Sequence, residues 1–227
     1  MPWPRFSYPG QFIRLPLLDM STTPTTTPHP ITAVTVFAGA REATVPAMNT
    51  LAKDFGATLA RRGITLVYGG SRLGLMGAVA QGAIDGGGST VGIIPKHLAA
   101  HEIAHTGLTE LVFVDTLAQR KALMGKRCDA FVALPGGTGT LDELFDEWTN
   151  QQLALHTKPI GLLGVDFWQP LIQMVDHMVA HGFVRQEDRD SLVVADDPNE
   201  LLDLLAQWQP QRPRWSPAPQ DTSHESK

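Results

Sequence analysis

AFVALPGGTGTLDELFDE, residues 130–147, is the stretch that decides the fold. Its first five residues form a short apolar run, which is typical of a strand buried on both faces of a sheet. Pro135-Gly136-Gly137 break the run, and apolar residues then recur at helical spacing. A buried strand that turns tightly into a helix is the repeating unit of a parallel α/β sheet.

The same alternation extends in both directions from this stretch. Strands are predicted over 31–38, 64–68, 90–94, 111–114, 130–134, 160–163 and, at one edge, 193–194. Helices are predicted over 46–62, 73–85, 116–127, 139–155 and 168–181, with a last helix that begins at Asp197-Pro198. This order predicts an α/β fold in a single domain, with a doubly wound parallel sheet and helices on both faces.

The two ends of the chain differ in composition from the stretch between them. Residues 1–30 include the Thr- and Pro-rich run STTPTTTPHP and have no periodic apolar face, so we expect a disordered leader. Residues 209–227 are a polar, Pro-rich tail. We therefore expect the folded domain to span residues 31–208.

The composition argues against several classes of partner. The formal net charge is −5 and there is no basic run, which argues against nucleic acid but not against a small phosphorylated ligand. No apolar run reaches the roughly 20 residues of a membrane helix. The single cysteine, Cys128, excludes an intrachain disulfide. With no basic-then-apolar signal at the N-terminus, these features indicate a cytoplasmic protein.

The turn Gly136–Thr140 carries the strongest functional signal. Glycines let a ligand approach the backbone, and the N-terminus of the following helix presents free N–H groups and partial positive charge to an anion. No Gly-Lys-Ser/Thr follows, so the turn is not a P-loop. The alternative is a purely structural turn. Glu143, just behind the turn, is either an acid that complements the helix dipole or a catalytic carboxylate for glycosyl hydrolysis.

Two further strand-to-helix turns contain candidate ligand contacts. The first is YGGSRLGLMG, residues 68–77, in which we expect contacts from Gly70, Ser71, Gly74 and Met76. The second, DTLAQRK (115–121), places Arg120 and Lys121 near a helix N-terminus, where the dipole disfavours cations unless an anion lies nearby. Solvated surface charges are the alternative reading. His97, His101 and His105 recur every fourth residue but resemble no closed zinc site.

Together these motifs resemble the LONELY GUY family, the cytokinin riboside 5'-monophosphate phosphoribohydrolases, long mislabelled as lysine decarboxylases. The resemblance covers about residues 32–192 and is carried mainly by PGGTGTLDE (135–143), YGGSRLGLMG and DTLAQRK. It implies a Rossmann-like fold, and a homodimer or higher homo-oligomer with sites near the subunit interface. It also implies hydrolysis of a nucleoside 5'-monophosphate, a cytokinin ribotide or AMP, to free base and ribose 5-phosphate, without a metal or redox cofactor.

By position, the resemblance makes Arg120 and Glu143 the catalytic pair. The ligand contacts that it implies are Lys121, Gly136, Gly137, Thr138, Gly139, Thr140, Glu102 and, with less support, Thr149. The chain departs from the usual family pattern at four places: the loop Ala38-Gly39-Ala40-Arg41 stands for Cys-Gly-Ser-Ser, Ser71 for a third glycine, Leu117 for methionine and Asp142 for glutamate. Without hydroxyls at positions 40 and 41, the contacts to base and ribose, and hence the base preference, stay open.

Three other functions fit the sequence less well. A carrier resembling the molybdenum-cofactor carriers has the same glycine signature and binds a phosphorylated pterin without hydrolysis, but the Arg120-Lys121 pair favours the enzyme. An NAD(P)-dependent dehydrogenase fits less well, because the first strand is not followed by Gly-x-Gly-x-x-Gly. A lysine decarboxylase requires a lysine for pyridoxal phosphate, and no motif marks one.

Overall fold

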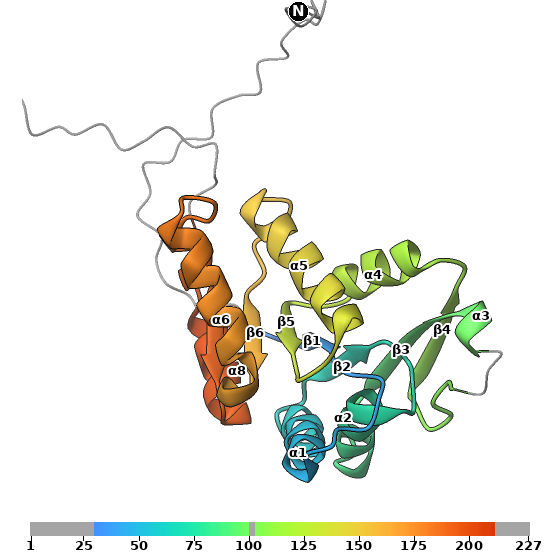
Figure 1. Ribbon diagram of the computed structural model, residues 1–227. Coiled ribbons are helices and arrows are strands. Elements are labelled where there is room, and N and C mark those ends of the chain that lie inside the picture. Colours follow the sequence, from blue (N-terminus) through green and yellow to red (C-terminus); the bar gives the residue numbers. More distant parts are fainter. Residues whose placement is uncertain (1–29, 100–102, 212–227) are drawn as a thin grey trace, which may run out of the picture.

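A seven-stranded parallel sheet forms the centre of the computed structural model, which describes residues 30–99 and 103–211 (Figure 1). The strand order is β4-β3-β2-β1-β5-β6-β7, and every pairing is parallel. The strands are β1 (Ala33–Phe37), β2 (Thr65–Tyr68), β3 (Thr90–Pro95), β4 (Glu110–Val114), β5 (Ala130–Ala133), β6 (Ile160–Leu163) and β7 (Leu192–Ala195). The order reverses between β1 and β5, and ligands of such sheets bind at that switch point.

The described residues form eight helices, of which the last follows β7. They are α1 (Pro46–Arg61), α2 (Gly74–Asp85), α3 (Lys96–Ala99), α4 (Leu117–Lys126), α5 (Thr138–Gln152), α6 (Val165–Ala180), α7 (Gln186–Asp190) and α8 (Pro198–Gln207). Local sequence determines where several of them begin. Thr116 accepts a hydrogen bond from the Gln119 N–H at the start of α4, and Asp197 caps α8 in the same way ahead of Pro198.

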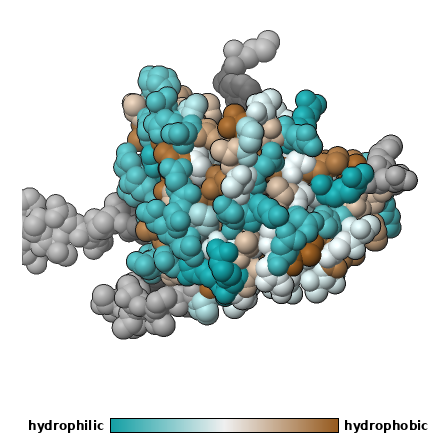
Figure 2. Space-filling model, turned by 90° about the horizontal axis from the view of Figure 1, so that it is seen from below, coloured by the Kyte–Doolittle hydropathy of each residue, from teal (hydrophilic) through white to brown (hydrophobic). Residues whose placement is uncertain are grey.

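Helices cover both faces of the sheet, so the core has two halves. On one face, the buried side chains of β1, β2 and β5 pack against α1, α2 and α8. On the other, Met124 of α4, Trp148 of α5 and Trp168 of α6 pack against the opposite side chains of the same sheet. Figure 2 looks onto the side where α1 and α2 lie; hydrophilic residues cover most of it, between small separate hydrophobic patches.

The predicted fold class is confirmed: one parallel sheet with helices on both faces. Boundaries differ at some elements, since α6 begins at Val165 rather than Trp168 and α5 ends at Gln152 rather than Leu155. The short helices α3 and α7 were not predicted. Residues 1–29 of the expected leader, and the expected tail from residue 212 onward, lie outside the described residues. In the described part of the chain, no helix has the length and apolar character needed to cross a membrane.

Candidate active site

A cavity of about 670 Å³ lies at the carboxyl ends of the strands, beside the switch point between β1 and β5. The loops after β1, β2, β3 and β5 form its walls, together with the first turns of α4, α5 and α6. The predicted site residues that line it are Ser71, Met76, Arg120, Lys121, Gly136, Gly137, Thr138, Gly139, Thr140 and Glu143. The fold therefore gathers residues from three separate motifs at one place. A cavity of this volume is in the range of small-molecule sites.

The turn before α5 opens into this cavity. Gly137, Thr138 and Gly139 are exposed, and a β-carbon added at Gly137 or Gly139 would meet no atom within 4 Å. Gly136 differs, because its added β-carbon would lie 2.1 Å from Thr140 Oγ1 and 2.9 Å from the backbone nitrogen of Gly39. Gly136 is thus required for packing, whereas the next residues leave the N-terminus of α5 accessible to an anion.

Arg120 of α4 and Glu143 of α5 both line the cavity and form an ion pair with each other. Arg120 Nη1 lies 3.1 Å from Glu143 Oε1, and the two side chains are 12% and 8% exposed. Arg120 Nε also donates to the Ile93 carbonyl at 3.2 Å, which fixes the guanidinium plane at the end of β3. Because Nε is bound to the Ile93 carbonyl, the guanidinium has little freedom to move relative to the Glu143 carboxylate.

The Glu143 carboxylate is incompletely satisfied. Oε1 is at ion-pair distance from Arg120, yet the orientation is not that of a hydrogen bond, and Oε1 is buried without a hydrogen-bond partner among the described residues. Burial raises the pKa of Glu143 above its ordinary value, and the charge of Arg120 only partly opposes this effect. A desolvated carboxylate of this kind is suited to accept a proton or to stabilise a developing cation.

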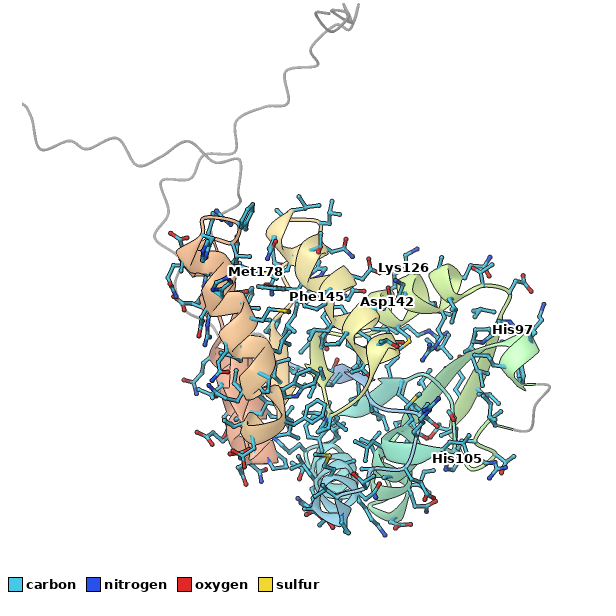
Figure 3. The ribbon with its side chains drawn as sticks, viewed as in Figure 1. His97, His105, Lys126, Asp142, Phe145 and Met178 are labelled. Carbon is cyan, nitrogen blue, oxygen red and sulfur yellow. The ribbon has the colours of Figure 1, made fainter. Side chains whose placement is uncertain are left out.

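Lys121 lines the cavity but is already engaged by α5. Its Nζ lies 3.1 Å from Asp142 Oδ2 and 3.0 Å from Asp146 Oδ2. Burial acts to lower the pKa of Lys121, but the hydrogen bonds and charges of the two aspartates outweigh it and raise the pKa. Figure 3 shows Asp142 near the start of α5, on the side where α4 lies. Lys121, which was predicted to contact the ligand, therefore forms ion pairs that link α4 to α5.

The turn YGGSRLGLMG, residues 68–77, contributes fewer residues to the cavity lining than predicted. Ser71 and Met76 line the cavity, whereas Gly70 and Gly74 do not. Gly70 and Gly74 have φ of +74° and +57°, a backbone conformation that favours glycine, and their predicted ligand contacts stay a prediction. Gly69 was missed: its added β-carbon would lie 1.9 Å from Arg120 Nη2, so its lack of a side chain makes room for the guanidinium.

Two predicted contacts do not join the cavity in the described chain. Thr149 is exposed on α5 and is not among the lining residues. Glu102 lies outside the described residues. His97 and His105 lie apart in Figure 3, and the described residues contain no group of three His, Cys, Asp or Glu that could hold a metal.

Several lining residues were not predicted as ligand contacts, although some of them lie within the quoted motifs. Besides Gly69, Asp142 and the loop Ala38–Arg41, they are Ala43, Thr44, Met48, Leu73, Leu75, Ile94, Leu98, Ile103, Leu117, Pro135 and Phe167. The position of residues 38–41 after the first strand was a usable signal, since ligands of such sheets bind at the carboxyl ends of the strands. Phe167 and Ile103 carry no local signal, because only the fold brings them to the cavity.

Comparison with known proteins finds relatives along most of the chain. The family model described as "Possible lysine decarboxylase" matches residues 76–205. The cytokinin riboside 5'-monophosphate phosphoribohydrolase LOG2 of Arabidopsis thaliana is 43% identical over 178 residues, which cover 78% of this chain and 84% of that one. The cytokinin riboside 5'-monophosphate phosphoribohydrolase of Rhodococcoides fascians is 44% identical, covering 73% of this chain and 84% of that one.

Solved structures with a similar fold are more distant in sequence. The molybdenum cofactor carrier protein of Chlamydomonas reinhardtii superposes with a TM-score of 0.61 at 20% identity, covering 77% of this chain and 96% of that one. The molybdenum cofactor binding protein of Rippkaea orientalis gives 0.58 at 22% identity, covering 76% and 93%. At this level of identity the similarity establishes the shared Rossmann-like fold and nothing about the ligand.

Proposed function

This chain belongs to the family of cytokinin riboside 5'-monophosphate phosphoribohydrolases, and we propose that it hydrolyses the N-glycosidic bond of nucleoside 5'-monophosphates. The products are a free base and ribose 5-phosphate, and the substrates are cytokinin riboside 5'-monophosphates, AMP or both. The observation that supports this most strongly is the buried Arg120–Glu143 pair beside the open N-terminus of α5.

In the proposed complex, the 5'-phosphate binds at Gly136–Thr140. The open backbone at Gly137 and Gly139 leaves room for it, and the α5 dipole favours its charge. The ribose then lies toward the cavity floor, where Glu143 is one turn further along the helix. The catalytic carboxylate and the phosphate turn thus belong to one rigid element, which is a reliable way to hold a reacting group in place.

The reaction breaks the bond between the ribose C1' and the base nitrogen. The departing base takes the bonding electrons, water adds to C1', and the proton lost by water ends on the base. Glu143 stabilises the cationic ribose or accepts the proton from water, and its raised pKa suits the second role. Arg120 orients the ligand and offsets negative charge as the base leaves.

The older description of the family as lysine decarboxylases fits this cavity poorly. A lysine that forms a Schiff base must be able to lose its proton. Lys121, the only lysine that lines the cavity in the described chain, is held by two aspartates that raise its pKa. The two ion pairs of Lys121 thus argue against a Schiff base at this residue.

The proposal includes a homodimer, or a higher homo-oligomer, with sites near the subunit interface, located in the cytoplasm. Its support is the family resemblance, and the position of Thr149 is consistent with it. This residue is exposed on α5 outside the cavity, so it would serve a ligand only if a second copy lay against that helix.

The test is base release by purified Glu143→Gln and Arg120→Ala proteins, with AMP and isopentenyl-AMP as substrates. We expect kcat to fall by on the order of 100-fold or more in each variant. Asp166→Asn is the matched control, since Asp166 is an exposed acid in the first turn of α6 and does not line the cavity. Near wild-type turnover in both site variants would refute the assignment. A phosphorylated pterin that co-purifies, with no base release from any nucleotide, would favour the carrier.

A further inference from the structure

The charged side chains that line the cavity cancel except for one. They are Arg41, Arg120, Lys121, Asp142 and Glu143 in the described chain. Arg120 faces Glu143 at 3.1 Å, and Lys121 lies 3.1 Å from Asp142 and 3.0 Å from Asp146. Arg41 has no ion pair and no hydrogen bond from its guanidinium to any of the described residues, and it is exposed. Among the described residues, Arg41 is therefore the one cation of the cavity wall that no carboxylate compensates.

Arg41 stands on a loop that is packed tightly against the phosphate turn. The Gly39 N–H donates to the Pro135 carbonyl at 3.1 Å, and an added β-carbon at Gly39 would lie 3.3 Å from the Gly136 α-carbon. The loop is thus in direct contact with the residues that precede the open N-terminus of α5. The side chain of Arg41, two positions after Gly39, therefore begins close to the turn Gly136–Thr140.

The turn at residues 68–77 contacts the loop Ala38–Arg41 as well. The Met76 N–H donates to the Gly39 carbonyl at 3.3 Å, and an added β-carbon at Gly74 would lie 2.4 Å from the Arg41 carbonyl oxygen. Gly74 therefore lets the two backbones touch. The backbone of Arg41 is fixed between two turns, although its side chain is exposed, and a fixed base reduces the entropy that the guanidinium loses on binding.

A nucleoside 5'-monophosphate brings about 1.5 to 2 negative charges to this cavity near neutral pH. The N-terminus of α5 supplies only about half a positive charge, and Glu143 lies one turn behind it. Arg120 and Lys121 are already balanced by carboxylates of α5. A guanidinium is also suited to bind phosphate oxygens in a bidentate manner.

From this arrangement, and given the function proposed above, we propose that Arg41 binds the 5'-phosphate and makes the site selective for nucleotides over nucleosides. The loop Ala38–Arg41 then has a cation, Arg41, at the position where the family pattern Cys-Gly-Ser-Ser has the hydroxyl of its last serine. The phosphate keeps its charge during cleavage of the glycosidic bond, so Arg41 contributes about equally to ground state and transition state. Its removal should raise KM much more than it lowers kcat.

The first experiment is calorimetric titration with ribose 5-phosphate, ribose and adenosine, none of which requires turnover. Arg41→Ala should weaken the binding of ribose 5-phosphate about tenfold, because a charge-assisted hydrogen bond is lost. Its affinity for adenosine and ribose should not change. Arg41→Lys should lose less, since it keeps the charge. Arg127→Ala is the matched control, because Arg127 pairs with Glu110 and does not line the cavity.

The second experiment is steady-state base release from AMP by the same proteins. We expect the KM of Arg41→Ala to rise about tenfold with kcat changed less than about threefold. Equal affinity of wild type and Arg41→Ala for ribose 5-phosphate would overturn the proposal, as would an equal loss for adenosine, which would place Arg41 at the base. If wild type binds ribose 5-phosphate but releases no base from any nucleotide, the hydrolase assignment fails and the titrations still decide Arg41. A wild type that binds none of the three ligands overturns both.

Discussion

Replacing Gly69 with alanine perturbs the site without changing any group proposed to take part in the reaction. A β-carbon at position 69 would lie 1.9 Å from Arg120 Nη2 and 2.9 Å from Met76 Sδ. Ordinary van der Waals contact begins near 3.4 Å, so the guanidinium must move by about 1.5 Å, the difference between these distances. That movement separates Arg120 Nη1 from Glu143 Oε1, which now lie 3.1 Å apart.

The expected loss of rate follows from the size of this displacement. A misplacement of about 1 Å can cost on the order of 100-fold in rate, so kcat of Gly69→Ala should fall by about 100-fold. The fold should persist, because the atoms met first belong to the end of a flexible side chain and Gly69 is not among the glycines with positive φ. The melting temperature should therefore stay within a few degrees of the wild-type value.

The assay combines base release from AMP with thermal unfolding of the single and double variants. If Gly69→Ala acts through Arg120, adding it to Arg120→Ala should cost little further activity, since the displaced group is already absent. Losses that multiply in Gly69→Ala/Arg120→Ala would refute this reasoning. So would full activity of Gly69→Ala, which would mean that the position of the guanidinium does not matter.

Three further changes test interactions that hold the domain together outside the cavity lining. Tyr68→Phe should leave the free energy of unfolding unchanged or raise it by up to about 1 kcal/mol, because the hydroxyl is buried without a partner among the described residues; denaturant titration checks this, and a clear loss contradicts it. Asp129→Ala should cost about 2 kcal/mol at pH 7, since Asp129 Oδ2 accepts from Thr32 N, Thr32 Oγ1 and the next backbone N–H. Burial acts to raise the pKa of Asp129, but these hydrogen bonds outweigh burial and hold the pKa below its ordinary value. The loss of unfolding free energy in Asp129→Ala should therefore be complete above about pH 4 and should vanish as the pH falls through the folded-state pKa. A loss that does not depend on pH would contradict this. Gly125→Ala should destabilise by about 1–3 kcal/mol in the same titration, because the new β-carbon would lie 2.9 Å from Glu147 Oε1, and a neutral effect would mean that the carboxylate moves freely.

Local sequence accounts for the predictable part of the fold. Strand β6 was predicted with its observed ends, because its short apolar run is contiguous and bounded by Pro159 and Gly164. Helices α3 and α7 have four and five residues, too few for a helical period to be read from the sequence. Helix α6 begins three residues earlier than predicted, directly after Gly164, whose φ of +102° turns the chain into the helix. Such a backbone angle depends on what surrounds the glycine.

The candidate site likewise contains residues that could be predicted from the sequence and residues that could not. Gly136–Thr140 and Glu143 could be predicted from one stretch, because a strand, a turn and a helix N-terminus are contiguous in the chain. The pairing of Arg120 with Glu143 could be proposed from the family resemblance but not measured. The role of Gly69 could not be predicted, since the atom that it accommodates comes from a residue 51 positions later.

The sequence by itself predicted the fold class from the alternation of strands and helices, and the candidate phosphate-binding turn from one contiguous stretch. The candidate catalytic pair, Arg120 and Glu143, was predicted from the family resemblance. Only the tertiary structure decided which charges of the cavity are compensated. Lys121 was expected to contact the ligand and proves to be held by two aspartates, whereas Arg41 lines the cavity with its charge uncompensated by described residues. Charge compensation depends on distances between side chains from different elements, and those distances exist only once the strands and helices have packed.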